Sequence, residues 1–227
     1  MRMDVSAVLR QIAATVNQEA VAPTTGGDEF NLWLEYMNMA QTEYSQTTEW
    51  ESSRKFYYPG VTGSSLASIS LPEDFKMMAA PAKLYLEGKA TPDEYSQIVP
   101  ENEQTYVNTD LYFKLVGNQS DGFTMVLNPG TLASGASFEV QYFSTPTSLS
   151  TTTQYLPMAD PVFVVEKTIA YIFRSRSDPR FQVIDQSANE RLIRMLENEN
   201  TAKFNNYSGL GFVPTTLGRR RQRIGMF

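Results

Sequence analysis

The chain has 227 residues, 41% of them hydrophobic, and a formal net charge of −6, a composition typical of a globular protein with a sizeable core. It contains no cysteine and no histidine, which excludes disulfides, thiolate zinc sites and catalytic sites built on imidazole. We therefore expect no cofactor and no metal. The N-terminus lacks the apolar region of a signal peptide, and no stretch is apolar enough to span a membrane, so we expect neither.

Two helices are predicted at the N-terminal end. Residues 3–18 place apolar side chains on one helical face, with Asp4 as the N-cap. Residues 28–54 predict a helix roughly 35 Å or more long, with Asp28 as its N-cap. Its large side chains recur every three or four residues, at Phe30, Trp33, Met37, Ala40, Tyr44, Thr47 and Trp50. Such a long apolar stripe needs partners along its whole length.

The middle of the chain predicts a β lobe. Residues 55–72 read as a hairpin, and residues 79–88 as a further strand. A capping box at residues 91–94 with Pro92 at the first helical position predicts one short helix over residues 91–99. Residues 105–116, 123–127 and 137–143 have the spacing of an antiparallel meander. In the last of these, Phe138, Val140 and Tyr142 would face one side of the sheet.

Helical periodicity returns in residues 161–175 and 178–204, and these segments supply partners for the long early helix. The predicted fold class is α+β. Residues 1–54 and 159–204 form a helical bundle, and residues 55–158 form an antiparallel β lobe inserted into it. Residues 205–227 form an extended C-terminal arm.

The arm combines turn-forming glycines and proline with isolated large apolar residues and the basic run RRRQR. The last nine residues hold four arginines and no acid, so removing these charges from the total of −6 leaves −10 for the rest. Apolar anchors indicate an arm that docks into a groove of another chain, where its arginines would meet acidic groups. The alternative is contact between RRRQR and nucleic acid.

Five segments, taken in order, resemble the head-to-tail adaptor proteins of tailed bacteriophages, also called connector or neck proteins, which form a ring on the portal. They are WESSRKFYYPGVTG at the end of the long helix, LPEDFKMM, FEVQYFSTPTSLS, YLPMADPVFVVEKTIAYIFRS and LENENTAKF in the final helix. The resemblance covers essentially the whole chain in layout. Proteins of this family resemble small helical bundles that carry an inserted β lobe.

The resemblance implies a structural virion protein that is not an enzyme. Such a protein binds the portal, extends the DNA channel and provides the platform for tail attachment and DNA ejection. Its partners would be the portal protein, copies of itself in a dodecameric ring and downstream tail or neck proteins. DNA would pass through without sequence-specific binding, as an acidic channel wall would favour. Its location would be the virion neck, after assembly in the host cytoplasm.

Within this interpretation, the arm is the predicted portal-binding element. Its predicted contact residues are Tyr207, Leu210, Phe212, Leu217, Arg219, Arg220, Arg221, Arg223, Ile224 and Phe227. Exposed tyrosines would contribute to the lateral surfaces of a ring, or would simply cover the sheet of a monomer. These tyrosines are Tyr57, Tyr58, Tyr106, Tyr112 and Tyr155.

Two other function classes remain open. Chemistry based on paired carboxylates survives the lack of histidine and cysteine, so a virion glycosidase acting on cell wall is an alternative. Its candidate pairs would be Glu49 with Glu51, or Asp93 with Glu94, although all four lie at caps and helix ends where solvated carboxylates are common. A carbohydrate- or receptor-binding module on the β lobe is the third possibility, and it would explain the aromatic residues but not the helices.

Overall fold

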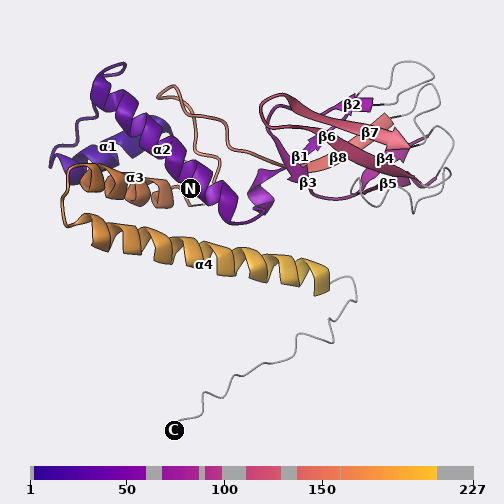
Figure 1. Cartoon of the computed structure of the whole chain (residues 1–227). Coiled ribbons are helices and arrows are strands. Elements are labelled where there is room, and N and C mark those ends of the chain that lie inside the picture. The colour runs from indigo at the N-terminus through magenta and orange to yellow at the C-terminus, as the bar shows by residue number, and fades with distance from the viewer. Residues whose placement is uncertain are drawn as a thin grey trace, which may run out of the picture.

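The structure is a computed structural model that describes residues 3–59, 68–86, 90–98, 111–128, 137–158 and 160–208, with only the backbone described for residues 202–208. The helices are α1 (Val5–Val16), α2 (Asp28–Thr47), the 3-10 turn η1 (Glu51–Ser53), α3 (Val162–Ser175) and α4 (Phe181–Ser208). The strands are β1 (Arg54–Tyr57), β2 (Ser68–Ser70), β3 (Phe75–Met78), β4 (Ala82–Tyr85), β5 (Asp93–Gln97), β6 (Tyr112–Asn118), β7 (Gly122–Asn128) and β8 (Ser137–Ser144). The helices form a helical body and the strands form a β lobe beside it (Figure 1).

The first helix is confirmed, including its cap. The Asp4 carboxylate accepts hydrogen bonds from the Ala7 backbone N–H at 2.7 Å and from the Ser6 hydroxyl at 3.0 Å. These bonds favour the ionised form, and the bond from Ala7 makes the largest contribution to lowering the Asp4 pKa. The cap fixes the start of α1, which then buries Val8 and Ile12 against α3.

The long helix α2 is shorter than predicted. It begins after Gly27 as the N-cap, with Asp28 in the first turn, and it ends at Thr47. Thr48 adopts an extended backbone, which turns the chain out of the helix. Trp50 is nevertheless buried, because its indole stacks on Tyr44 at 4.2 Å between ring centroids and its Nε1–H donates to the Tyr44 carbonyl at 2.7 Å. The helical spacing of apolar residues in the sequence extends to Trp50, beyond the end of α2, because the Trp50 indole packs into the same core as the helix.

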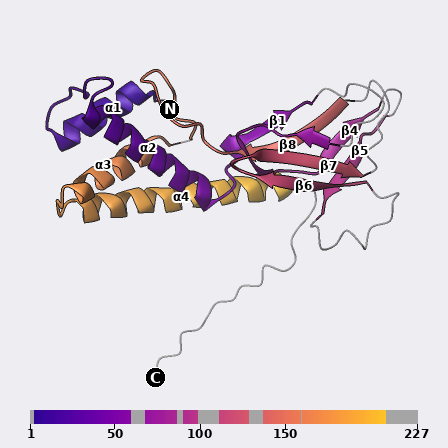
Figure 2. The same ribbon diagram turned by 45° about the horizontal axis from the view of Figure 1, so that its top comes forward.

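The two predicted C-terminal helices are confirmed. Helix α3 is the centre of the body, since it packs against α1, α2 and α4. It buries nearly its whole circumference, including Phe163 and Phe173. Helix α4 buries Ala188, Leu192 and Met195 in the first part of its length. In Figures 1 and 2 its later turns run past the other helices toward the side of the lobe.

The lobe is a curled eight-stranded sheet with the order β1-β8-β4-β5-β6-β7-β2, and β3 also pairs with β8. Strand β8 is its central element, because β1 lies along one side of it while β3 and β4 share the other. The predicted all-antiparallel sheet is corrected in one place, since β5 and β6 are parallel. The inward alternation of Phe138, Val140 and Tyr142 is confirmed, because all three are buried.

The predicted pairing of neighbouring strands holds only for β6 and β7, which form a hairpin over residues 112–128. The hairpin predicted over residues 55–72 is wrong, because β1 pairs with β8 and β2 pairs with β7. The meander also does not continue from β7 to β8. Turn residues show where a strand ends, but the partner is chosen by which apolar faces enclose the core.

The short helix predicted over residues 91–99 is wrong. This segment contains strand β5, in which Tyr95 is 1% exposed and pairs with Ala82 of β4. A helix cap contributes about 1 kcal/mol. Pairing on both sides, with β4 and β6, together with burial of Tyr95 and Ile98, outweighs that local preference.

The LPEDF sequence before β3 does more than end a strand. The Asp74 carboxylate accepts hydrogen bonds from the Tyr142 hydroxyl at 2.9 Å and from Lys55 Nζ at 2.5 Å. The Asp74 carbonyl accepts from the Thr145 backbone N–H at 2.8 Å. Phe75 is buried beside it. Asp74 thus links β1, the start of β3 and the end of β8, and the unpredicted strand β3 follows directly from it.

The body and the lobe have separate hydrophobic cores. The core of the body draws on α1, α2, α3, α4, Trp50 and the connection over residues 149–158. Among the described residues, the buried core of the lobe runs from Ile69 to Tyr142, with Tyr57 of β1 packed against it. In the part of the chain that the structure describes, no helix is both long and apolar enough to cross a membrane.

Candidate functional surfaces

The predicted C-terminal arm begins later than expected. Helix α4 continues to Ser208, so residues 205–208 are helical and Tyr207 belongs to the last turn of α4. This is a correction to the prediction that the arm starts at residue 205. The other nine predicted portal-binding residues lie outside the described residues; they are Leu210, Phe212, Leu217, Arg219, Arg220, Arg221, Arg223, Ile224 and Phe227.

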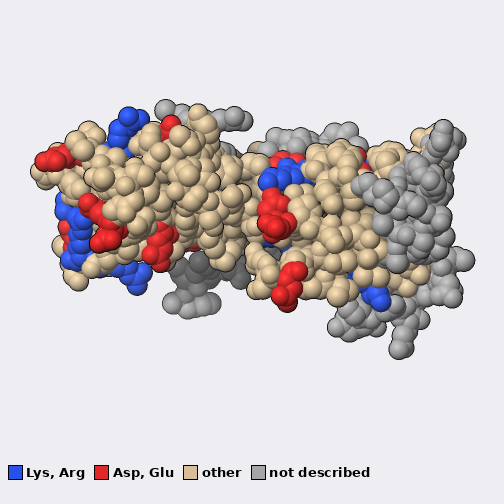
Figure 3. Space-filling view, turned by 90° about the horizontal axis from the view of Figure 1, so that it is seen from above, with Lys and Arg blue, Asp and Glu red and all other residues tan. Residues whose placement is uncertain are grey.

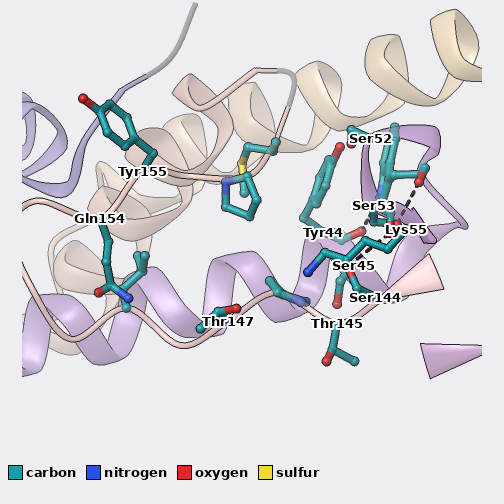
Figure 4. Close-up of a pocket in the computed structure, with 15 residues that line it drawn as sticks. Tyr44, Ser45, Ser52, Ser53, Lys55, Ser144, Thr145, Thr147, Gln154 and Tyr155 are labelled. Carbon is teal, nitrogen blue, oxygen red and sulfur yellow. Dashed lines mark hydrogen bonds between the residues drawn. The ribbon is translucent and has the colours of Figure 1, made fainter. Parts of the chain in front are cut away.

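A pocket of about 310 Å³ lies at the junction of the body and the lobe. Tyr44 and Trp50 provide aromatic surface, and Leu149, Pro157 and Met158 come from the connection between β8 and α3. Figure 4 shows hydroxyl-bearing side chains from α2, η1 and the end of β8 around the same space. The pocket therefore combines apolar walls with hydroxyl groups and has one charged side chain, Lys55.

Several polar groups of this pocket have structural partners. Lys55 Nζ is paired with Asp74, and the Ser144 hydroxyl donates to the Ser53 carbonyl at 3.1 Å. The Gln154 side-chain oxygen accepts from the Ser150 and Thr151 backbone N–H groups at 2.6 and 2.8 Å. These contacts join β1 to the start of β3, fix the end of β8 to η1 and shape the turn of the connection, which are structural roles.

The carboxylate pairs considered for glycoside hydrolysis are not arranged as catalytic pairs. Asp93 and Glu94 are consecutive residues of β5, so their side chains point to opposite faces of the sheet. Glu51 lies 2.6 Å from Arg54 Nε in an exposed ion pair. Glu51 is exposed and Glu49 is half-buried, so the structure does not enclose this pair in a cavity.

The sequence analysis missed a buried cation at the centre of the body. Lys167 of α3 is 6% exposed, and its Nζ lies 2.9 Å from Glu43 of α2 and 2.8 Å from Asp185 of α4. Burial opposes its charge, but the hydrogen bonds and negative charges of Asp185 and Glu43 outweigh burial and raise its pKa. Tyr171 donates to Glu43 at 2.7 Å, and burial followed by this bond raises the tyrosine pKa.

A second ion-pair network joins α3 and α4. The guanidinium of Arg191 lies 2.8 Å from Asp160 and 3.1 Å from Glu166. The hydrogen bond with Glu166, and then that with Asp160, raises the Arg191 pKa. Both networks tie helices together, and no group of three or more potential metal-ligating residues occurs among the described residues.

The predicted exposed tyrosines have different environments. Tyr58 and Tyr155 are 64% and 61% exposed, as expected. Tyr57 is partly buried against the lobe core, and Tyr112 is 7% exposed, so the expectation of an exposed side chain is wrong for Tyr112. Tyr106 lies outside the described residues.

Other exposed aromatic and apolar side chains join Tyr58 on the outer face of the sheet. Phe56 stacks against Tyr58 with ring centroids 6.5 Å apart and planes 10° from parallel. Met77 and Tyr85, on β3 and β4, are 41% and 40% exposed. The alternation of side chains along β1 indicates that Phe56 and Tyr58 face the same side of the sheet. Only the pairing of β1, β3 and β4 with β8 brings them onto one surface with Met77 and Tyr85.

Charge is sparse on the face seen in Figure 3. Acidic and basic side chains lie intermixed at the end of the body and at the part of the lobe next to it, and most of the surface between is uncharged. No protein-family model and no curated protein matches this chain.

Proposed function

We propose that this chain is a ring-forming head-to-tail adaptor of a tailed bacteriophage, a structural virion protein that binds the portal and extends the DNA channel toward the tail. The observation that carries the proposal is that the long helix α4 leads directly into the basic C-terminal segment of the chain. Helix α4 is anchored at its start in the body, and residues 209–227, with four arginines and several large apolar side chains, follow directly from its end. A long rigid helix is a suitable support for a docking arm.

The anchoring of α4 supports this role. Its first part is fixed by burial of Leu192 and by the ion pairs of Arg191. Farther along, the Glu199 carboxylate accepts from the Glu51 backbone N–H at 2.7 Å and ties α4 to η1. Because the helix is held at both places, a load on the arm would be passed to the whole body.

The arm contributes affinity only when its anchors bind together. On this proposal the 19 residues of the arm become ordered on binding, at a cost of about 1–2 kcal/mol each, while each enclosed large apolar side chain contributes about 1.5–3 kcal/mol and each charge-assisted bond a similar amount. A single arm is therefore a weak ligand. Twelve arms on one portal ring would bind through multivalency, so we expect the chain to be mainly monomeric alone and to assemble on the portal template.

Removal of residues 209–227 tests the proposal. The shortened chain, ending at Ser208, should remain folded because both cores lie within residues 3–195, but it should not bind the portal ring of the same virus. Co-sedimentation with purified portal rings measures this. A matched control replaces Arg219, Arg220, Arg221 and Arg223 by lysine, which keeps the charge but loses the fork of guanidinium donors, and should weaken binding without abolishing it. If the shortened chain binds portals as the full chain does, the arm is not the docking element.

A carbohydrate-binding module is the second candidate. The observation in its favour is the exposed group of Phe56, Tyr58 and Tyr85, whose rings could stack on sugars beside the polar side chains of Glu139 and Gln141. Retention of the protein on purified cell-wall polysaccharide, abolished by Tyr58→Ala, would favour this function over the adaptor. The helical body and its basic arm have no role in that alternative.

A further inference from the structure

Strands β1, β3, β4 and β8 present a continuous outward-facing surface, which we call the sheet array. Cross-strand pairing places Phe56 beside Gln141, Lys83 beside Glu139 and Met77 beside Phe143 on this face. The sheet array consists of Arg54, Phe56, Tyr58, Met77, Lys83, Tyr85, Glu139 and Gln141. The opposite face of the same strands is buried in the lobe core. Four of its members are large, exposed and apolar or aromatic: Phe56, Tyr58, Met77 and Tyr85.

The sheet array is large enough to be the centre of an interface. The exposed fractions of Phe56, Tyr58, Met77 and Tyr85 are 53%, 64%, 41% and 40%. At roughly 200 Å² for each such side chain they present about 400 Å² together, which is half of the approximately 800 Å² per partner in a stable interface. Strand β1 also lies at the edge of the sheet, where its outer side has no partner strand among the described residues. Aromatic side chains beside such an edge are what an interface would cover.

The body contains a concave apolar surface, which we call the helical groove. It has a volume of about 590 Å³, with Val165 and Ile169 of α3 at its floor, Ala14 and Thr15 of α1 on one side and Val183 and Ser187 of α4 on the other. Val165 and Ile169 are 5% and 4% exposed, whereas Val183 is 73% exposed. A floor of buried side chains with an exposed apolar wall has the form that receives aromatic anchors.

The two surfaces lie on opposite parts of the elongated molecule. Ser187 and Val183 are near the start of α4, which Figure 1 places at the end of the body away from the lobe. The sheet array therefore cannot reach the helical groove of its own chain. A ring of identical chains requires one surface to meet a different surface of the next chain, and these two surfaces have projecting and concave apolar forms.

We propose that the sheet array of one copy of this chain docks into the helical groove of the next copy, with Phe56 and Tyr58 as the anchors. This lateral contact deepens the proposed adaptor function and rests on it. Because the apolar part of the sheet array covers only about half of a standard interface, a single contact is weak, and closure into a ring depends on the portal template.

Site-specific cross-linking tests the contact, and the absence of cysteine from the chain makes it free of background. Ser137 borders the sheet array opposite Tyr85, and Ser187 lines the helical groove. Full-length Ser137→Cys and Ser187→Cys proteins are mixed at high concentration with a short bis-maleimide, and the covalent heterodimer is measured. The control replaces Ser137→Cys by Ser120→Cys, an exposed position in the β6–β7 turn outside both surfaces.

The expected result is a heterodimer yield well above that of the Ser120→Cys control. Phe56→Ser in the Ser137→Cys protein should lower the rate of cross-linking about tenfold, as for loss of a central aromatic anchor. Equal yields with Ser137→Cys and Ser120→Cys would overturn the proposal. So would efficient cross-linking of Ser137→Cys with itself, which indicates a two-fold contact, or insensitivity to Phe56→Ser. If the Ser137→Cys and Ser187→Cys proteins do not cross-link to each other but still bind portal rings, this contact is refuted and the adaptor function is not.

Discussion

The helical body and the β lobe are stabilised in different ways. The body has ion-pair networks that join its helices, with the buried Lys167 between Glu43 and Asp185 and the half-buried Arg191 between Asp160 and Glu166. The lobe depends on one late strand, β8, with which three earlier strands pair. The helices of the body are therefore joined by side-chain ion pairs in addition to apolar packing, while the strands of the lobe are joined by backbone pairing around their apolar core.

The largest expected effect separates the two cores. Phe138→Ala in β8 and Phe163→Ala in α3 remove fully buried rings, and each should cost about 3–5 kcal/mol of unfolding free energy. Since the cores share no residue, Phe138→Ala should raise amide exchange in β1, β4 and β8 while α3 stays protected. Phe163→Ala should do the reverse. Hydrogen exchange read by mass spectrometry measures both, and equal loss of protection in both parts would show that they unfold as one unit.

A smaller effect is expected at the buried cation of the body. Lys167→Met leaves Glu43 and Asp185 facing each other without a cation, and because both are more than a third exposed we expect a loss of about 2 kcal/mol. The triple change Lys167→Met, Glu43→Gln and Asp185→Asn should recover much of it. Arg176→Ala breaks an exposed ion pair with Glu29 and should cost less than about 0.5 kcal/mol.

The same lysine gives the body a pH dependence with a defined sign. Its folded pKa is raised above 10.5, so its contribution is complete below that pH and is lost as the pH rises through the folded pKa. Chemical denaturation at neutral and alkaline pH should show a decrease in stability for the natural chain. An equal decrease for Lys167→Met would contradict this origin.

A loss smaller than that at Lys167 is expected in the lobe. Asp74→Asn keeps an acceptor for Tyr142 but loses the ionic bond with Lys55, both bonds being partly exposed, so we expect a loss of about 1 kcal/mol. The effect should appear in the thermal unfolding of the lobe and be absent from hydrogen exchange in α3 and α4. Protection lost in the helices instead would mean that Asp74 stabilises the junction.

The sequence predicts the body better than the lobe for a physical reason. The helices α1, α3 and α4 are visible because their apolar residues recur within one segment, and Asp4 marks its helix end chemically. The end of α2 was misplaced because Trp50 reaches the same core from outside the helix. In the lobe, most of the strand-forming residues were predicted, but the partners of β1 and β2 lie about 55–90 positions away in the sequence.

The candidate surfaces show the same limit. Tyr58 and Tyr155 are exposed as the sequence suggested, while Tyr112 is buried because β6 lies inside the sheet between β5 and β7. The sheet array could not be predicted, since Phe56, Met77 and Tyr85 come together only through β8. Lys167 could have been noticed as a charged residue within an apolar helix, but its two partners come from other helices.

The late position of β8 has a consequence for synthesis on the ribosome. Strand β1 leaves the ribosome about 80 residues before β8, which at about 5–20 residues per second is an interval of roughly 4–16 s. During that time β4 can pair only with β5, β1 and β3 have no partner strand among the described residues, and α1 and α2 precede their partner α3 by a still longer interval. All strands of the lobe are synthesised by residue 144, before α3 and α4. The β lobe can therefore fold before the helical body, although the body contains the N-terminal helices α1 and α2.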